Sequence, residues 1–321
     1  MSSIFDKRTS YKPFNYPWAY EGWLTSEKAH WMTKEVPLGD DVRDWKTILN
    51  SGEKKLLTQI FRFFTQADCD VAVGYVERYL PQFKQIEIRM MLLSIAAREC
   101  VHIDAYSKLI EELGLPEVEY SAFLEYGEMK EKHDYMFQQR DGLEGLAQDM
   151  AVFSAFGEGL QLFSSFVILL NFTRFGKMKG MGQLVTWSIR DESHHVDCMI
   201  KLYKTLLDEN PTIWTDRFKS KLYATCEYMV GMEDKFIDLA YQEAGDIEGL
   251  TPEEVKQYIR YIANKRLGQL DLKPMFSEQM VNPLPWVDSI VNGKEHTNFF
   301  ENKPTVYTKA SVTGNWNEAF D

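Results

Sequence analysis

The sequence contains only four cysteines, and none of them forms a paired motif with another. Cys69, Cys100, Cys198 and Cys226 are widely spaced, and no Cys-x-x-Cys occurs. This spacing argues against a disulfide framework and against a cysteine zinc site. We expect all four thiols to be reduced and buried.

The chain also lacks an excess of basic residues and a long apolar run. Its 36 Lys and Arg residues face 48 Asp and Glu residues, a net charge of -12, which argues against nucleic acid or an anionic membrane as the main partner. The longest apolar run, near Phe163 to Leu170, is too short to span a bilayer, and the first residues contain no apolar signal core. We therefore expect a cytoplasmic protein with no nucleic-acid and no membrane partner.

Strand alternation and hairpin dipeptides are nearly absent, whereas apolar residues recur with a helical period over most of the chain. With 45% hydrophobic residues, the chain has enough apolar surface for a large core. The pattern predicts an all-α protein with long helices. The predicted helices cover residues 22–34, 51–79, 86–113, 117–140, 143–175, 181–207, 212–245 and 252–271.

Composition changes near both ends of this helical region. Residues 1–20 are rich in Pro and Tyr and are predicted to form an extended arm. Residues 21–272 are predicted to form one helical domain. From residue 273 to residue 321, proline, scattered glycine and polar residues predict a flexible C-terminal tail that is partly disordered.

Glu99, His102 and Tyr106 share one helix face, because residues three and four apart are neighbours on a helix. A carboxylate, an imidazole and a phenol therefore converge. The same Glu-x-x-His spacing recurs at Glu192 and His195 on another predicted helix. Two such helices predict a site for two metal ions.

The spacing alone is a weak signal, because a surface pair of this kind is common on helices. Glu27 and His30 repeat it on a short amphipathic segment among Ser, Lys and Thr. We interpret His30 as a structural surface residue.

Single acids on the preceding helices strengthen the prediction. Asp68 lies on the apolar face of the helix before Glu99, and Glu158 lies on the apolar face of the helix before Glu192. Burial of an ionised acid costs on the order of several kcal/mol in folding free energy unless the acid is paired or binds metal. Asp70 competes with Asp68, but we interpret its helix face as solvated because it also carries Gln66 and Glu77.

This arrangement matches the plan of a ferritin-like carboxylate bundle, in which two helices each supply a single acid and two others each supply a Glu-x-x-His pair. Oxygen and imidazole donors suit iron or manganese, and the thiolates that would select zinc are missing. The predicted metal ligands are Asp68, Glu99, His102, Glu158, Glu192 and His195. The structural alternative is a helical bundle whose acids and histidines form internal salt bridges.

With these residues in hand, the sequence resembles the small, radical-generating subunit of class I ribonucleotide reductase over nearly its whole length. The six predicted ligands fall on the metal ligands of that family, and Tyr106 falls on its radical tyrosine. The block Arg190-Asp191-Glu192-x-x-His195 and the segment Asn282-Pro283-Leu284-Pro285-Trp286 are also similar to family signatures.

The resemblance implies a ferritin-like fold and a path for an oxidising equivalent. It implies that a dimetal centre with an O₂-derived oxo bridge, most simply Fe₂, oxidises Tyr106 to a neutral radical. Asp191, Trp31 and the tail residue Tyr307, with Glu301 as its acidic neighbour, are then the transfer residues. It further implies a homodimer and a separate large catalytic subunit, docked through the tail, which reduces ribonucleoside diphosphates to deoxyribonucleotides.

Several alternatives stay open at this stage. Mn₂ and mixed Mn/Fe centres use nearly the same ligands as Fe₂, and diphosphate and triphosphate substrates are not distinguished. Another ferritin-like dimetal oxidase or monooxygenase would carry similar ligands. A non-catalytic iron-binding or structural bundle is the remaining class, although storage bundles are much shorter chains.

Overall fold

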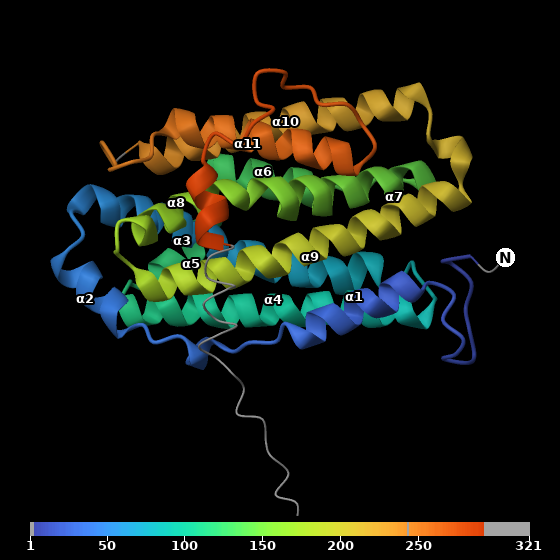
Figure 1. The fold of residues 1–321 in the computed structure, drawn as a ribbon, viewed down its shortest axis with the longest axis horizontal. Helices are drawn as coiled ribbons and strands as arrows, with labels where there is room; N and C mark the ends of the chain where they lie inside the picture. The colour runs from blue at the N-terminus through green and yellow to red at the C-terminus, as the bar shows by residue number, and fades with distance from the viewer. Residues whose placement is uncertain (1–2, 243, 292–321) are drawn as a thin grey trace, which may run out of the picture.

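A computed structural model describes residues 3–242 and 244–291, except for the side chains at positions 65, 66, 123 and 124. Every regular element in this part of the chain is helical, which confirms the predicted all-α class. Four long helical rods run side by side along the long axis of the molecule (Figure 1). The rods are α3 (Ser51–Val73) with η2 (Gly74–Tyr79), α4 (Ile86–Leu113), the composite α7 (Gly142–Met150), η4 (Ala151–Gln161) and α8 (Phe163–Arg174), and α9 (Lys179–Glu209).

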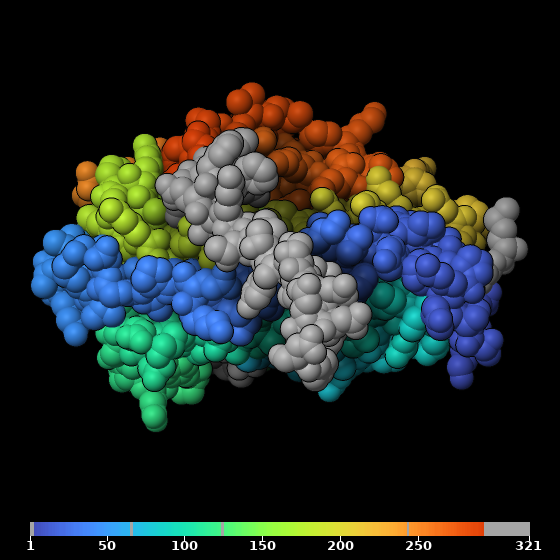
Figure 2. Space-filling model, turned by 60° about the horizontal axis from the view of Figure 1, so that its bottom comes forward, coloured from blue at the N-terminus to red at the C-terminus, as the bar shows by residue number. Residues whose placement is uncertain are grey.

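Further helices cover this central bundle on two sides. On one side α10 (Asp216–Tyr241) and α11 (Pro252–Gln269) pack on η4, with α6 (Gly127–Phe137) beside them (Figure 1). On the other side α1 (Pro17–Lys28) and α2 (Gly39–Thr47) pack on α4 and α9. Figure 2 shows this N-terminal segment in blue toward both ends of one face of the molecule.

Local sequence signals explain where several rods begin and end. Asn50 Oδ1 accepts a hydrogen bond from the backbone N–H of Glu53, and the Glu53 carboxylate accepts one from the backbone N–H of Asn50, which caps the start of α3. Thr251 and Glu254 do the same for α11. Gly114 ends α4 with a φ of 73°, a left-handed conformation that glycine adopts without strain.

Two predicted helices need correction. The first helix begins at Pro17 and ends at Lys28, not at residues 22 and 34, because Pro17 occupies a first-turn position that needs no N–H. The predicted arm therefore includes helical residues 17–20, and its Ile4 is fully buried. Residues 117–140 form three short pieces instead of one helix: α5 (Val118–Ser121), η3 (Ala122–Glu125) and α6.

The apolar stretch of the composite rod from Gly142 to Arg174 is longer than the run near Phe163 to Leu170 that was identified in the sequence. It is long and apolar enough to cross a membrane by length and composition, but its apolar window is entirely buried inside the bundle. A core helix of a soluble protein has the same features. Within it, the eleven residues of η4 form a π-helix, where a regular helical period was predicted.

The predicted tail is packed in its first part. Leu284 and Val287 are buried, and a helical turn over residues 285–291 lies against α8 and α9. The first part of the predicted tail therefore packs on the bundle, and the flexibility expected from residue 273 stays a prediction. None of the four cysteines forms a disulfide within the described residues. Cys198 and Cys226 are buried, as predicted, whereas Cys69 is half-buried and Cys100 is exposed.

Candidate metal centre

The bundle interior holds all six predicted ligands, which come from four different helical segments. Asp68 projects from α3, and Glu158 projects from η4. The two Glu-x-x-His pairs project from α4 and α9. No member of the set is more than 2% exposed: Asp68, Glu99, His102, Glu158, Glu192 and His195.

Four of the six residues form one tight group. Glu99, Glu158, Glu192 and His195 each offer a ligand atom, and these atoms lie within 4.8 Å of one another. His102 touches the group, because its Nδ1 lies 3.2 Å from Glu99 Oε2 and 3.1 Å from Glu192 Oε1. Asp68 lies near enough to interact electrostatically with both pairs, although it is outside the tight group.

The donor atoms of this group fit a metal site. Buried atoms that lack a well-formed hydrogen bond within the described part of the chain include Asp68 Oδ2, Glu99 Oε1, Glu158 Oε1, Glu192 Oε2 and His195 Nδ1. Each such atom costs about 1–3 kcal/mol if it stays unpaired. Ion-pair contacts of His195 Nδ1, 2.9 Å from Glu99 Oε1 and 3.3 Å from Glu192 Oε2, offset part of this cost. Cations bound between these atoms would remove this cost, since carboxylate oxygen and imidazole nitrogen are ligands for iron and manganese.

The pKa shifts in the centre reflect burial and crowding of like charges. Burial raises the pKa values of Asp68 and Glu158 well above the usual range, and neighbouring carboxylates raise them further. Burial alone would also raise the pKa of Glu99, but His102 and His195 lower it to about 2. The pKa of His195 rises to about 10, because Glu99 and Glu192 outweigh the effect of burial. Metal ions would take over the positive charge that these protons supply.

Tyr106 lies beside the centre, one turn beyond His102 on α4. Its side chain is 2% exposed, and its hydroxyl donates a hydrogen bond to Ser188 Oγ at 3.1 Å. The ring stacks on Phe64, with centroids 4.4 Å apart. Burial raises the pKa of this phenol, so it is protonated at neutral pH. The structure thus encloses Tyr106 in an apolar pocket next to the predicted ligands.

Trp31 and Asp191 form a hydrogen-bonded link to the same centre. Trp31 Nε1 donates to Asp191 Oδ2 at 2.7 Å, and this oxygen lies 3.4 Å from His102 Nε2. Arg190 and Arg98 also pair with Asp191. The link is buried, since Trp31 is only 2% exposed. Two further predicted transfer residues, Tyr307 and Glu301, lie outside the described residues.

His30 and Asp70, which competed with the predicted ligands in the sequence, have different surroundings from the metal centre. His30 is exposed, as its interpretation as a surface residue requires. Asp70 is not on a solvated face: its carboxylate is half-buried and lies 3.0 Å from His133 Nε2 on α6. The sequence of α3 could not reveal this partner, because it comes from a distant segment.

One residue at the centre was not predicted as functional. Tyr75 of η2 is fully buried, and its hydroxyl donates a hydrogen bond to Glu158 Oε2 at 2.6 Å. A sequence signal existed, because Tyr75 follows Asp68 by seven residues and so lies two turns along the same helix face.

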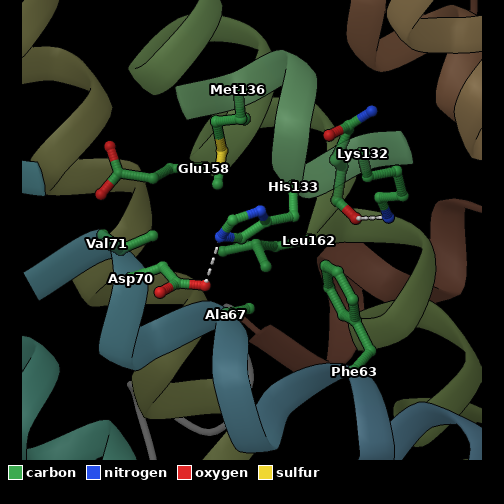
Figure 3. Close-up of a pocket in the computed structure, with 11 residues that line it drawn as sticks. Phe63, Ala67, Asp70, Val71, Lys132, His133, Met136, Glu158 and Leu162 are labelled. Carbon is green, nitrogen blue, oxygen red and sulfur yellow. Dashed lines mark hydrogen bonds and ion pairs between the residues drawn. The ribbon is translucent and has the colours of Figure 1, made fainter. Parts of the chain in front are cut away.

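A small pocket borders Glu158 on the side of α6 (Figure 3). It runs from the half-buried ion pair of His133 and Asp70 to Glu158, with Val71 and Met136 along its wall. Its cavity volume is about 20 Å³, enough for one water-sized molecule. The pocket therefore admits only very small molecules to the neighbourhood of the centre.

Comparison with known proteins agrees with this arrangement. The family model described as "Ribonucleotide reductase, small chain" matches residues 8–283. A probable ribonucleoside-diphosphate reductase small subunit of Invertebrate iridescent virus 3 is 50% identical, with 96% of this chain and 86% of that protein covered. A ribonucleoside-diphosphate reductase subunit beta of Chlamydia pneumoniae is 29% identical, with 93% and 89% covered.

Solved structures share the fold at low sequence identity. The ribonucleotide reductase R2 subunit from Clostridium botulinum has a TM-score of 0.83 at 21% identity, over 90% of this chain and 94% of that one. The dimanganese(II)-NrdF of Streptococcus sanguinis has a TM-score of 0.76 at 21% identity, over 88% and 99%. These likenesses extend over almost the whole bundle.

Proposed function

This chain belongs to the ribonucleotide reductase small-chain family, and we propose that it is the subunit that generates and exports the radical of a class I ribonucleoside-diphosphate reductase. The observation that carries the proposal is the buried group of carboxylate and imidazole ligand atoms, several of which lack a well-formed hydrogen bond within the described residues. The proposed ligands of two metal ions are Asp68, Glu99, His102, Glu158, Glu192 and His195.

A bound dimetal centre would supply dioxygen activation and a one-electron oxidant. The residues of the chain hold and shield the reacting groups. Tyr106 gives up its phenolic hydrogen atom and becomes the stored radical, and its burial against Phe64 protects it from solvent. Dioxygen approaches through the pocket beside Glu158, whose volume of about 20 Å³ suits a molecule of that size.

The route outward begins at the hydrogen-bonded link between Trp31 and Asp191. Asp191 Oδ2 accepts the indole N–H, so it is placed to hold the proton when Trp31 loses an electron. We propose that Tyr307, assisted by Glu301, continues the route to a cysteine of a large catalytic subunit. That subunit reduces ribonucleoside diphosphates, and the tail docks on it.

The metal is proposed to be iron, with an oxo bridge derived from O₂, while Mn₂ and Mn/Fe remain alternatives with the same donors. The solved neighbour from Streptococcus sanguinis is described as a dimanganese(II) protein. We further propose a homodimer built on helix faces and a cytoplasmic location.

The small size of the pocket favours this function over a monooxygenase. Organic substrates occupy pockets of roughly 300–1,000 Å³, whereas the pocket that borders Glu158 measures about 20 Å³. An enzyme that stores an oxidising equivalent on its own tyrosine needs no larger space. The described surroundings of the centre therefore suit radical generation.

The proposal is tested on the full chain loaded with Fe(II) and exposed to O₂. We expect two iron ions per chain and a long-lived tyrosyl signal in electron paramagnetic resonance. Tyr106→Phe should keep the iron and the fold but lose the long-lived signal and ribonucleotide reduction with the large subunit. An unchanged long-lived signal in this variant, or a wild type that binds no metal, would contradict the assignment.

A further inference from the structure

Two buried tyrosines, not one, lie at the candidate centre, and they have different partners. Tyr106 on α4 donates its hydrogen bond to the hydroxyl of Ser188. Tyr75 on η2 donates its hydrogen bond to the carboxylate of Glu158, at 2.6 Å. Its ring packs against the edge of Phe153, and its ring centroid lies 6.5 Å from that of His195. Tyr75 is thus in direct contact with a proposed ligand.

The two oxygens of Glu158 have separate environments. Oε2 accepts the hydrogen bond of Tyr75. Oε1 lacks a hydrogen bond within the described residues and lies 3.8 Å from His195 Nδ1. Oε1 is therefore the oxygen available to a metal ion, while Oε2 is available to the phenol. One carboxylate joins the phenol to the centre.

We propose that Tyr75 is a second oxidisable tyrosine of the metal centre, which takes the oxidising equivalent when Tyr106 is absent or already oxidised. This inference rests on the proposed function. In the step, the O–H bond of Tyr75 breaks. One electron passes to the oxidised dimetal centre, which is reduced by one unit, and the proton passes along the existing hydrogen bond to Glu158 Oε2. The product on the protein is a neutral tyrosyl radical at Tyr75.

Contact with a carboxylate explains why Tyr75 would be oxidised in preference to Tyr79. A phenol that loses an electron becomes a strong acid, so a carboxylate already in hydrogen-bond contact with it makes the oxidation easier. Tyr79 is the next ring, with its centroid 6.1 Å from that of Tyr75. Its hydroxyl donates to the backbone oxygen of Asp149, which is a very weak base. Tyr75 alone of this pair has a carboxylate in contact.

The same contact predicts a short lifetime. The proton stays within hydrogen-bond distance of Tyr75, so the electron and the proton can return together. Among the described residues, the hydroxyl of Tyr106 contacts that of Ser188 and no carboxylate, so a proton that leaves Tyr106 is not held beside its ring. We therefore expect the Tyr75 radical to decay much faster than the Tyr106 radical.

The experiment compares three full-length variants loaded with Fe(II) and mixed with O₂, then frozen at times from milliseconds to minutes. They are Tyr106→Phe, Tyr106→Phe/Tyr75→Phe and the control Tyr106→Phe/Tyr203→Phe. Tyr203 is a buried tyrosine eight residues beyond His195 on α9, about 12 Å along the helix. Ring-deuterated tyrosine identifies any tyrosyl signal by its narrowing.

We expect a transient, deuterium-sensitive signal in Tyr106→Phe and in the Tyr203 control, and at least a tenfold loss in the variant without Tyr75. If that variant does not fold, 3-fluorotyrosine placed at position 75 of Tyr106→Phe keeps the phenol and should add fluorine splitting. An unsplit signal, or an equal signal without Tyr75, overturns the inference.

The outcome can be separated from failure of the proposed function. If the wild type binds two iron ions and forms its long-lived radical, but iron-loaded Tyr106→Phe shows no tyrosyl signal at any time, only the role of Tyr75 is overturned. If the wild type neither binds iron nor forms a radical, the proposed function fails and the role of Tyr75 fails with it.

Discussion

Each carboxylate at the candidate centre is held in place by what surrounds it, and Glu99 shows this most directly. Its two oxygens lie close to two different histidines, with Oε2 3.2 Å from His102 Nδ1 and Oε1 2.9 Å from His195 Nδ1. The same carboxylate therefore bridges the two Glu-x-x-His helices. Its removal would take away one of the two carboxylates, Glu99 and Glu192, that both imidazoles contact.

Glu99→Ala should reduce iron binding from two ions to fewer than about one per chain, since coordination and orientation are lost together. The matched control is His30→Ala, which removes a histidine with the same Glu-x-x-His spacing from an exposed position. Metal analysis after desalting measures both. Full occupancy in Glu99→Ala, or an equal loss in His30→Ala, would show that the ligands lie elsewhere.

A second buried charge pair lies near the centre and has a structural role. Lys132 Nζ lies 2.6 Å from Glu233 Oε2, between the rings of Phe63 and Phe236 at 4.0 and 4.1 Å. Both charged groups are nearly inaccessible to solvent. Burial lowers the pKa of Lys132 and raises that of Glu233, while their mutual attraction opposes both shifts.

Lys132→Met should lower the free energy of unfolding by about 3–5 kcal/mol, because it leaves Glu233 buried without its cation. Lys132→Met/Glu233→Met should recover most of this loss, since two apolar side chains of similar volume need no partner. Denaturant unfolding of the metal-free chain at pH 7 measures both values. A double variant as unstable as the single one would mean that packing, not charge, is lost.

At the residue scale, the sequence was informative wherever a helix face carried the signal. The placement of Asp68 and Glu158 on apolar faces follows from spacing, and both are buried. The partner of Asp70 and the hydrogen bond of Tyr75 depend on α6 and η4, which are distant in sequence. Such contacts between elements have no local pattern.

The π-helix η4 determines where Glu158 lies. Gly159, the next residue, allows side chains of the neighbouring helices to approach the backbone of η4 closely. An added Cβ at Gly159 would come within 2.7 Å of Arg266 Nε and 3.1 Å of Val196 Cγ2. Arg266 Nε also donates a hydrogen bond to the backbone oxygen of Gly159 at 2.7 Å. Helices α9 and α11 are thus packed against backbone at this point.

Gly159→Ala should therefore destabilise the fold by about 1–3 kcal/mol, the usual cost of overpacking. Gly231→Ala in α10 is the matched control, because an added Cβ there meets no described atom within 4 Å. This control should be neutral or stabilising by up to about 1 kcal/mol. Thermal unfolding compares the two variants. Equal unfolding midpoints would show that η4 accommodates the added methyl group without loss of stability.

At the element scale, long helices with clear start and stop signals could be predicted from the sequence, whereas the irregular helical segments could not. The predicted bounds of α4 agree with the structure because Gly114 marks its end. Regular single helices were predicted where η4 is π-helical and where α5, η3 and α6 are separate pieces. Tertiary packing decides these features.

At the scale of the whole molecule, the N-terminal segment closes one face of the bundle (Figure 2). Glu87 on α4 accepts hydrogen bonds from the backbone N–H groups of Asn15 and Tyr16, and Tyr16 donates its hydroxyl to Glu209 on α9. The arm therefore ties two rods of the bundle together. The division of the chain into arm, domain and tail at residues 20 and 272 remains a prediction.

The last residues of the chain provide the proposed link to a partner. Trp316 and Phe320 lie outside the described residues, in a polar segment with Pro304 and Gly314 that has too few apolar residues for a core. Aromatic side chains in such a segment are suited to fill pockets of another protein. Each anchor of this kind contributes about 2 kcal/mol or more to binding, so two anchors correspond to roughly a thousandfold in affinity.

Deletion of residues 315–321 should weaken binding to the large subunit by about a thousandfold, while iron content and the tyrosyl signal stay unchanged, because the described centre lies within residues 68–195. Tyr307→Phe is the complementary variant: it keeps both aromatic anchors, so binding should persist while ribonucleotide reduction stops. Binding is measured with the large subunit immobilised on a surface, and turnover is measured as the rate of deoxyribonucleotide formation. A truncated chain that still binds and turns over at low partner concentration would assign docking to the folded bundle instead.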